Sequence, residues 1–125
     1  MIALPLMAAA ASAATAAPVA DLNLADTKCI AVIAAIASRE DDPLRKSGLA
    51  SGMMYYIGRV DGRTPGYDYA GEITRLFGDK SFVENEFEGE ANRCGNEMTA
   101  KGKEVRAFGQ ALKAAGRKAV EKPGD

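Results

Sequence analysis

The stretch NLADTKCIAVIAAIAS, residues 23–38, decides the fold class of this chain. Its larger apolar side chains recur at the spacing of one helical face. They are Cys29, Ile30, Val32, Ile33 and Ile36. We expect Asn23 to cap this helix, with Asp26 three residues further on, and the helix to end near Ser38. The stretch therefore predicts an amphipathic helix that packs against other helices.

Two more helices follow from the same spacing. Asp42-Pro43 is typical of an N-cap followed by proline at the first helical position. The apolar row of this second helix is Leu49, Met53, Tyr56, Ile57 and Val60. A short third helix is indicated by Tyr69, Ile73, Leu76 and Phe77. We expect Gly78 to end it, because glycine is common just past a helix C-terminus.

A last, long helix is predicted from Ser81 to about Lys118. Ser81 and Glu84 have the spacing of a capping box, in which a serine bonds forward and a glutamate bonds back. One face carries Val83, Phe87, Ala91, Cys94 and Met98. The sequence thus predicts an all-α fold, a small four-helix bundle with a long C-terminal helix.

Glycine recurs every seven residues in this last helix, in register with large apolar residues. The glycines are Gly95, Gly102, Gly109 and Gly116, and they alternate with Met98, Val105 and Leu112. Each glycine inside an exposed helix costs about 1 kcal/mol relative to alanine. Either the glycines let another segment approach closely, or the region is broken into short turns. The shared period favours a packed glycine seam, within the chain or against another copy.

Length and charge limit the class of protein. The chain has 125 residues, with 16 basic and 17 acidic side chains, so one domain with no overall attraction to nucleic acid is expected. Residues 79–97 are acidic and residues 101–122 are basic. This order complements the dipole of the long helix.

The first residues predict export. Residues 1–20 are uncharged, apolar and then rich in small residues, with two Ala-x-Ala patterns between residues 11 and 16. We interpret them as a cleaved signal peptide, followed by one helical domain over residues 21–120 and a disordered tail over 121–125. A disordered alanine-rich tail or a short membrane anchor are the alternatives. The mature protein is expected to be periplasmic or secreted, with no stable membrane span.

Cys29 and Cys94 are the two cysteines of the chain. In an oxidising compartment such a pair is expected to form a disulfide, here between the first and last helices. A redox-active pair or a lone nucleophile is the alternative. It is disfavoured because the spacing is not C-x-x-C and the chain has no histidine to activate a thiol.

The residue inventory argues against an enzyme. Without histidine, a phosphate-binding loop or a nucleophile elbow, the common acid–base and nucleophilic sets are missing, and no cofactor is expected. A carboxylate-based hydrolase using Asp61 and Asp68 is the alternative. Four glutamates alternate between residues 84 and 90. On a helix they scatter, so a solvated face is a better interpretation than a cation site.

The segment MMYYIGRVDGRTPGYD, residues 53–68, carries the candidate partner surface. Its members are Tyr55, Arg59, Asp61, Arg63, Tyr67 and Asp68. Tyrosine and arginine are favoured contact residues at interfaces. The alternative is that these side chains close the helix exit by packing, capping and ion pairing.

This segment, between an early KC and a later ANRC, resembles small exported two-cysteine helical proteins of sphingomonad-type alphaproteobacteria. Tyr55, Gly58, Asp61 and Gly62 also resemble the Y-x-x-G-x-x-D-G segment of the Rap1a/Tai group of periplasmic immunity proteins. Cys29 lies further upstream here than in that group. Size, export and cysteine number are similar to those of acid-stress chaperones of the HdeA group. The first resemblance implies no activity, and the other two imply a non-catalytic, protein-binding envelope protein of immunity or stress type. A purely structural envelope protein is the remaining alternative.

Overall fold

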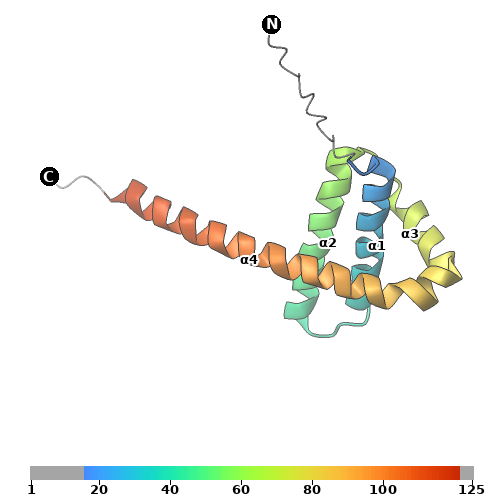
Figure 1. Ribbon diagram of the computed structural model, residues 1–125. Helices are drawn as coiled ribbons and strands as arrows, with labels where there is room; N and C mark the ends of the chain where they lie inside the picture. Colours follow the sequence, from blue (N-terminus) through green and yellow to red (C-terminus); the bar gives the residue numbers. More distant parts are fainter. Residues whose placement is uncertain (1–15, 122–125) are drawn as a thin grey trace, which may run out of the picture.

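The computed structural model describes residues 16–121, and this part of the chain is all-α (Figure 1). The helices are α1 (Val19–Ala37), α2 (Pro43–Arg63), α3 (Tyr69–Gly78), the π turn η1 (Phe82–Glu86) and α4 (Phe87–Val120). α1 and α2 lie side by side, α3 packs against α1, and α4 crosses the pair. The C-terminal half of α4 extends past α2 and away from the bundle. The predicted fold class is confirmed.

The predicted segments at the two ends lie mostly outside the described residues. Of the predicted signal peptide, only residues 16–20 are described, and of the predicted tail only Glu121. Within the described part, no helix is both long enough and apolar enough to cross a bilayer.

The start of α1 differs from the prediction. The helix begins at Val19, directly after Pro18, so Asn23 lies inside it and the predicted N-cap at Asn23 is wrong. Asn23 is buried and its amide donates to the Thr64 hydroxyl at 2.8 Å. Its polar side chain serves a contact with the exit of α2 and not the end of its own helix.

The start of α2 follows the prediction, and the start of the last helix does not. Asp42 caps α2 by accepting from the backbone N–H of Leu44 at 2.8 Å. Ser81 was predicted to open the last helix with a capping box, but it is already helical and makes no capping bond. Asp79 takes that role, because its carboxylate accepts from the Ser81 N–H at 2.9 Å.

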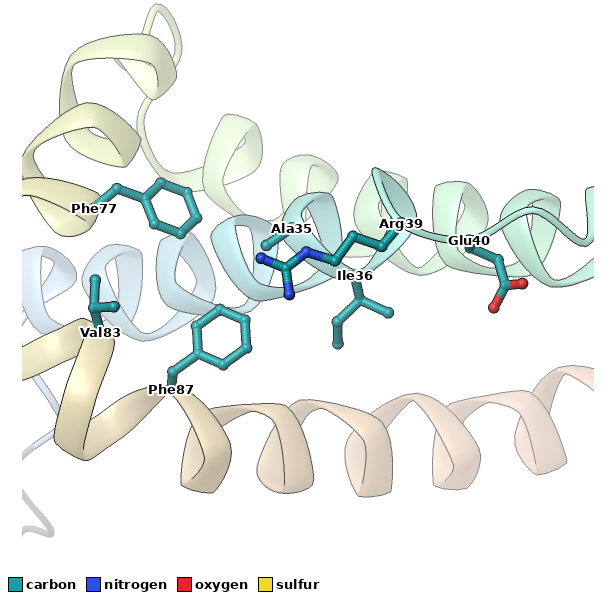
Figure 2. Close-up of a pocket in the computed structure, with 7 residues that line it drawn as sticks. All are labelled: Ala35, Ile36, Arg39, Glu40, Phe77, Val83 and Phe87. Carbon is teal, nitrogen blue, oxygen red and sulfur yellow. The ribbon is translucent and has the colours of Figure 1, made fainter.

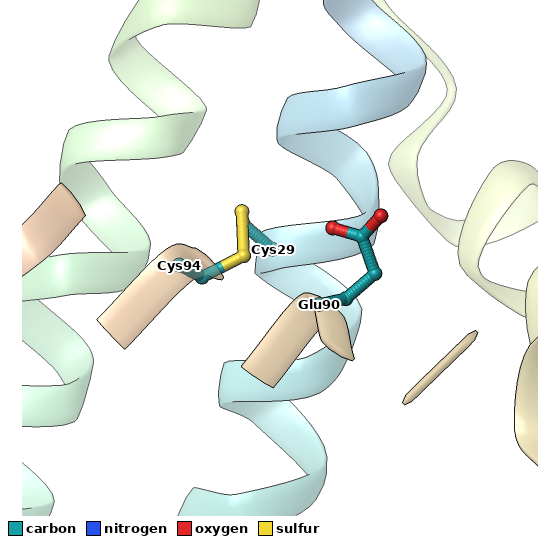
Figure 3. A group of neighbouring side chains, drawn as sticks. All are labelled: Cys29, Glu90 and Cys94. Atoms are coloured by element: carbon teal, nitrogen blue, oxygen red, sulfur yellow. A yellow bond between two sulfur atoms is a disulfide. The ribbon is translucent and has the colours of Figure 1, made fainter. Parts of the chain in front are cut away.

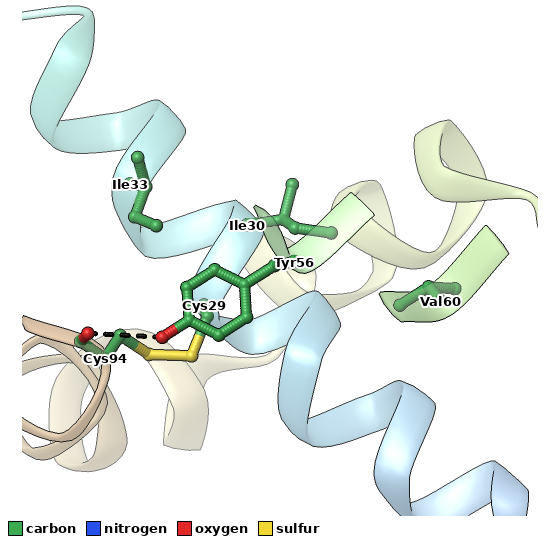
Figure 4. Close-up of a cluster of buried hydrophobic side chains, with 6 residues drawn as sticks. All are labelled: Cys29, Ile30, Ile33, Tyr56, Val60 and Cys94. Atoms are coloured by element: carbon green, nitrogen blue, oxygen red, sulfur yellow. Dashed lines mark hydrogen bonds between the residues drawn. A yellow bond between two sulfur atoms is a disulfide. The ribbon is translucent and has the colours of Figure 1, made fainter. Parts of the chain in front are cut away.

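Two buried clusters share α1, which makes it the central helix. One cluster joins α1 to α2 and α4, and it holds Cys29, Ile30, Ile33, Tyr56, Val60 and Cys94 (Figure 4). The other joins α1 to α3 and η1, and it holds Ala31, Val32, Leu76 and Phe82. Burial of both faces explains why the apolar run of residues 29–33 is nearly continuous.

The predicted disulfide is confirmed. Cys29 and Cys94 are bonded, with 5.6 Å between their Cα atoms, and both are buried. The bond joins α1 to α4 across 65 residues of sequence. The hydroxyl of Tyr56, on α2, donates to the Cys94 carbonyl at 3.1 Å, so all three helices meet at the bond (Figure 4).

The predicted glycine seam does not pack within the chain. A Cβ atom added at Gly95, Gly109 or Gly116 would meet nothing within 4 Å. A close contact at a glycine is found instead at Gly52 of α2, where an added Cβ would overlap the sulfur of Met98. α4 contacts the bundle only where it crosses α1 and α2. Most of the glycines that recur every seven residues lie beyond this crossing, where no other helix faces them.

Tyr56 is expected to make the free energy of unfolding fall as the pH rises through the alkaline range. Burial raises its pKa to about 12, and the carboxylate of Glu97 adds to the effect. In the unfolded chain tyrosine ionises near pH 10, so this stabilisation is complete below pH 10 and is lost as the pH rises toward 12. We expect Tyr56 to account for about 1 kcal/mol of lost stability between pH 9 and pH 11.

Urea unfolding of the wild type and of Tyr56→Phe at several pH values measures this loss. The variant should lose stability less steeply above pH 10. The variant should still lose some stability with rising pH because of Tyr69. Burial and the hydrogen bond to Asp61 also raise the pKa of Tyr69 to about 12. If stability fell equally steeply with pH in the wild type and in Tyr56→Phe, the prediction would be contradicted.

Candidate functional site

A buried polar cluster ties the exit of α2 to the first turns of α1. Asp26 of α1 is 1% exposed, and its Oδ2 lies 3.2 Å from Nε of Arg59. Arg63 binds the same carboxylate oxygen through Nη2. Arg63 Nε also donates to Oδ1 of Asn23 at 3.0 Å. Both arginines of the candidate partner surface therefore bind side chains of α1.

Arg59 extends this cluster to α4. Its Nη1 donates to the Tyr55 hydroxyl at 2.9 Å and also pairs with Glu97. Burial alone would lower the pKa of Arg59, but the hydrogen bond to Tyr55 and the carboxylates of Asp26 and Glu97 raise it. Arg59 is thus held as a cation that links three helices.

The other residues of the candidate surface also have partners inside the chain. The hydroxyls of Tyr67 and Thr27 are 3.0 Å apart and hydrogen-bonded. Asp68 caps α3 by accepting from the Gly71 N–H at 3.0 Å, and the Tyr69 hydroxyl donates to Asp61 at 2.6 Å. The two aspartates thus serve different contacts.

The contacts above explain the composition of the exit segment by packing, capping and ion pairing. A partner contact there stays a prediction. Of the six residues of the candidate partner surface, Tyr55 is the best placed to contact a partner. Its ring is only partly buried and lies beside Arg59 and Lys101.

Sequence reasoning missed the α1 side of this cluster. Asn23, Asp26 and Thr27 are the three buried polar residues of the described chain. One signal was available: Asp26 lies three and seven residues before Cys29 and Ile33, so it continues the apolar face by one turn. A charged residue at a core position predicts a buried partner, although the spacing alone does not say which one.

Glu90 lies beside the disulfide (Figure 3). Because the two sulfurs are bonded to each other, neither is a thiolate that could hold a metal ion. Arg93 pairs with Glu90 and donates from Nη2 to the Cys29 sulfur at 3.2 Å. Two more of the alternating glutamates pair separately, Glu86 with Lys28 and Glu84 with Lys80. The group is thus a buried disulfide, and the three glutamates named here are each paired with a cation.

The last 18 residues of α4, residues 103–120, form what we call the arm. Every residue of the arm is exposed, and the arm projects from the bundle (Figure 1). Val105, Phe108 and Leu112 form an apolar row on one side, with Phe108 64% exposed. Ala107 and Ala114 lie on the opposite side. The arm carries five basic residues and one acidic residue. It is thus an amphipathic, basic helix.

No protein-family model matches the chain, and no curated protein and no solved structure is significantly similar to it.

Proposed function

We propose that this chain is a non-catalytic binding protein of an oxidising, extracytoplasmic compartment, and that the arm binds a protein partner. The exposed apolar row of the arm carries the proposal. A helix without tertiary contacts is marginal in water, and Gly109 and Gly116 weaken it by about 1 kcal/mol each. A partner that covers Val105, Phe108 and Leu112 would supply the missing stabilisation.

The side chains of the arm define the chemistry of the partner. Five basic residues against one acidic residue favour a groove with an acidic rim, and the row of Val105, Phe108 and Leu112 favours an apolar floor. Gly109 and Gly116 lie next to the row and leave room for the partner's backbone. A second copy of the arm is a poor partner, because two basic helices repel each other.

The disulfide and the expected signal peptide support the compartment. Disulfides persist in the periplasm and outside the cell, and are rare in the cytosol. A protein partner in the envelope agrees with the immunity or stress role that the resemblances imply. The protein would then act by occupying or shielding its partner.

A pair of matched double variants tests the role of the arm. Val105→Asp/Leu112→Asp places two carboxylates in the apolar row, and Ala107→Asp/Ala114→Asp places two on the opposite face. Net charge changes equally in both, and all four positions are exposed, so the bundle should keep its stability. Tagged wild type first captures the partner from an envelope fraction, and calorimetry then compares the three proteins.

We expect the row variant to bind at least tenfold more weakly than the wild type, and the control to stay within about threefold. Equal weakening by both variants would show that only charge matters. Unchanged binding by the row variant would show that another surface binds the partner. Either result would contradict the proposal.

A further inference from the structure

A hollow of about 520 Å³ opens at the far end of α1 from the polar cluster (Figure 2). Its walls come from three segments: the C-terminal end of α1, the end of α3, and the π turn with the start of α4. Ile36, Phe77, Val83 and Phe87 line it. We call this hollow the basin. Its volume is within the range of pockets that hold small molecules.

The basin leaves apolar surface in contact with water. Ile36, Phe77 and Val83 are three of the exposed large apolar residues in the described chain, and they gather around this one hollow. Gathered exposure of this kind marks binding surfaces more often than scattered exposure does. The basin is therefore a candidate site for an apolar group.

A buried phenylalanine, Phe82, packs behind the aromatic wall of the basin. Phe82 is fully buried, and its ring meets those of Phe77 and Phe87 edge to face, with 6.2 Å between centroids in each pair. The N–H of Phe87 bonds to the Phe82 carbonyl, which closes the π turn. This turn brings Phe87 next to Phe82, while Val83 and Phe87 both line the hollow. Single π turns inside helices are frequent at functional sites.

One cation borders this apolar surface. The side chain of Arg39 reaches over the basin toward Phe77 and Phe87 (Figure 2). Among residues 16–121, none of the ion pairs involves Arg39. Glu40 also borders the basin, but its carboxylate points away and accepts from the Asp42 N–H at 3.0 Å. The guanidinium is thus free to bind an anion.

We propose that the basin binds an amphiphilic carboxylate of the fatty-acid class. The carboxylate would pair with the guanidinium of Arg39, which matches a carboxylate with two parallel hydrogen bonds. The alkyl chain would lie on Phe77, Val83 and Phe87. This site is separate from the arm, because no residue of the arm lines the basin.

Calorimetry of the full chain with dodecanoate, below its micelle concentration, tests the site. The variants are Arg39→Gln, Arg39→Lys and, as a control, Lys46→Gln, which removes an exposed cation of α2 that does not line the basin. Dodecanol is the matched ligand without charge. Circular dichroism checks that each variant is folded.

We expect the wild type and the control to bind dodecanoate equally, and Arg39→Gln to bind it at least tenfold more weakly. Arg39→Lys should restore part of the affinity, and dodecanol should bind to the wild type and to Arg39→Gln alike. Phe77→Ala should weaken both ligands. No binding of dodecanoate to the wild type, or equal binding to Arg39→Gln, would overturn the proposal. Dimers that form through the basin and exclude dodecanoate would overturn it too.

Discussion

Replacing Asp26 with alanine is expected to lower the free energy of unfolding by about 3–5 kcal/mol. The carboxylate is almost fully buried and pairs with Arg59 and Arg63, both of them on α2. Without it, the partly buried guanidinium of Arg63 loses its carboxylate partner, and Arg59 keeps only Glu97. The missing side chain also leaves a small cavity with polar walls beside the core. Urea unfolding at neutral pH measures the loss.

Asp61→Ala is the matched control for this change. Asp61 is also a carboxylate near the exit of α2, but it is exposed and its one side-chain hydrogen bond comes from Tyr69. We expect it to cost less than about 1 kcal/mol. If Asp26→Ala were as mild as Asp61→Ala, the polar cluster would not hold α1 and α2 together.

Loss of the disulfide is the second large effect. Cys29→Ala or Cys94→Ala should lower the free energy of unfolding by about 2–5 kcal/mol, because the bond closes a loop of 65 residues and restricts the unfolded chain. The two single variants should lose similar amounts, since each removes the same bond. Chemical unfolding with and without a reductant gives the same comparison in the wild type.

The oxidation state of the exported protein is checked by mass spectrometry without reduction. We expect one peptide pair joined through Cys29 and Cys94, with no thiol open to alkylation. The reductant should not affect the stability of either alanine variant. Two alkylatable thiols in exported protein, or alanine variants as stable as the wild type, would contradict the expected role of the bond.

Much of the fold could be predicted because helix formation leaves a local signal. The spacing of Cys29, Ile30 and Ile33 reports which side of α1 is buried, whatever buries it. The Asp42-Pro43 pair acts within a few residues of the helix start that it sets. The disulfide was predicted from the expected oxidising compartment and from there being only two cysteines.

Local signals gave wrong results where two residues could serve the same role. Both Asp79 and Ser81 can cap a helix, and the carboxylate that comes first in the chain takes the position. Asn23 also has the chemistry of a cap, yet it bonds to Arg63, 40 residues away. Sequence spacing does not show which partner a polar residue finds when the partner lies on another helix.

The glycine period and the exit of α2 show the same limit. Met98 of α4 packs against Gly52 of α2, and α4 then runs past the bundle (Figure 1), so Gly109 and Gly116 face open space. The tyrosines and arginines of the exit were correctly located on a helix end. Which of them lie inward depended on Asp26, whose burial only the assembled bundle shows.

Hydrogen exchange followed by mass spectrometry tests most directly whether the arm is free in the isolated protein and covered in the complex. We predict that amides of residues 103–120 exchange fast in the isolated protein, while those of residues 29–33 stay protected. With the captured partner, protection should appear in the arm around Val105, Phe108 and Leu112. Protection of the arm in the isolated protein, or no gain of protection in the complex, would contradict the proposed role of the arm.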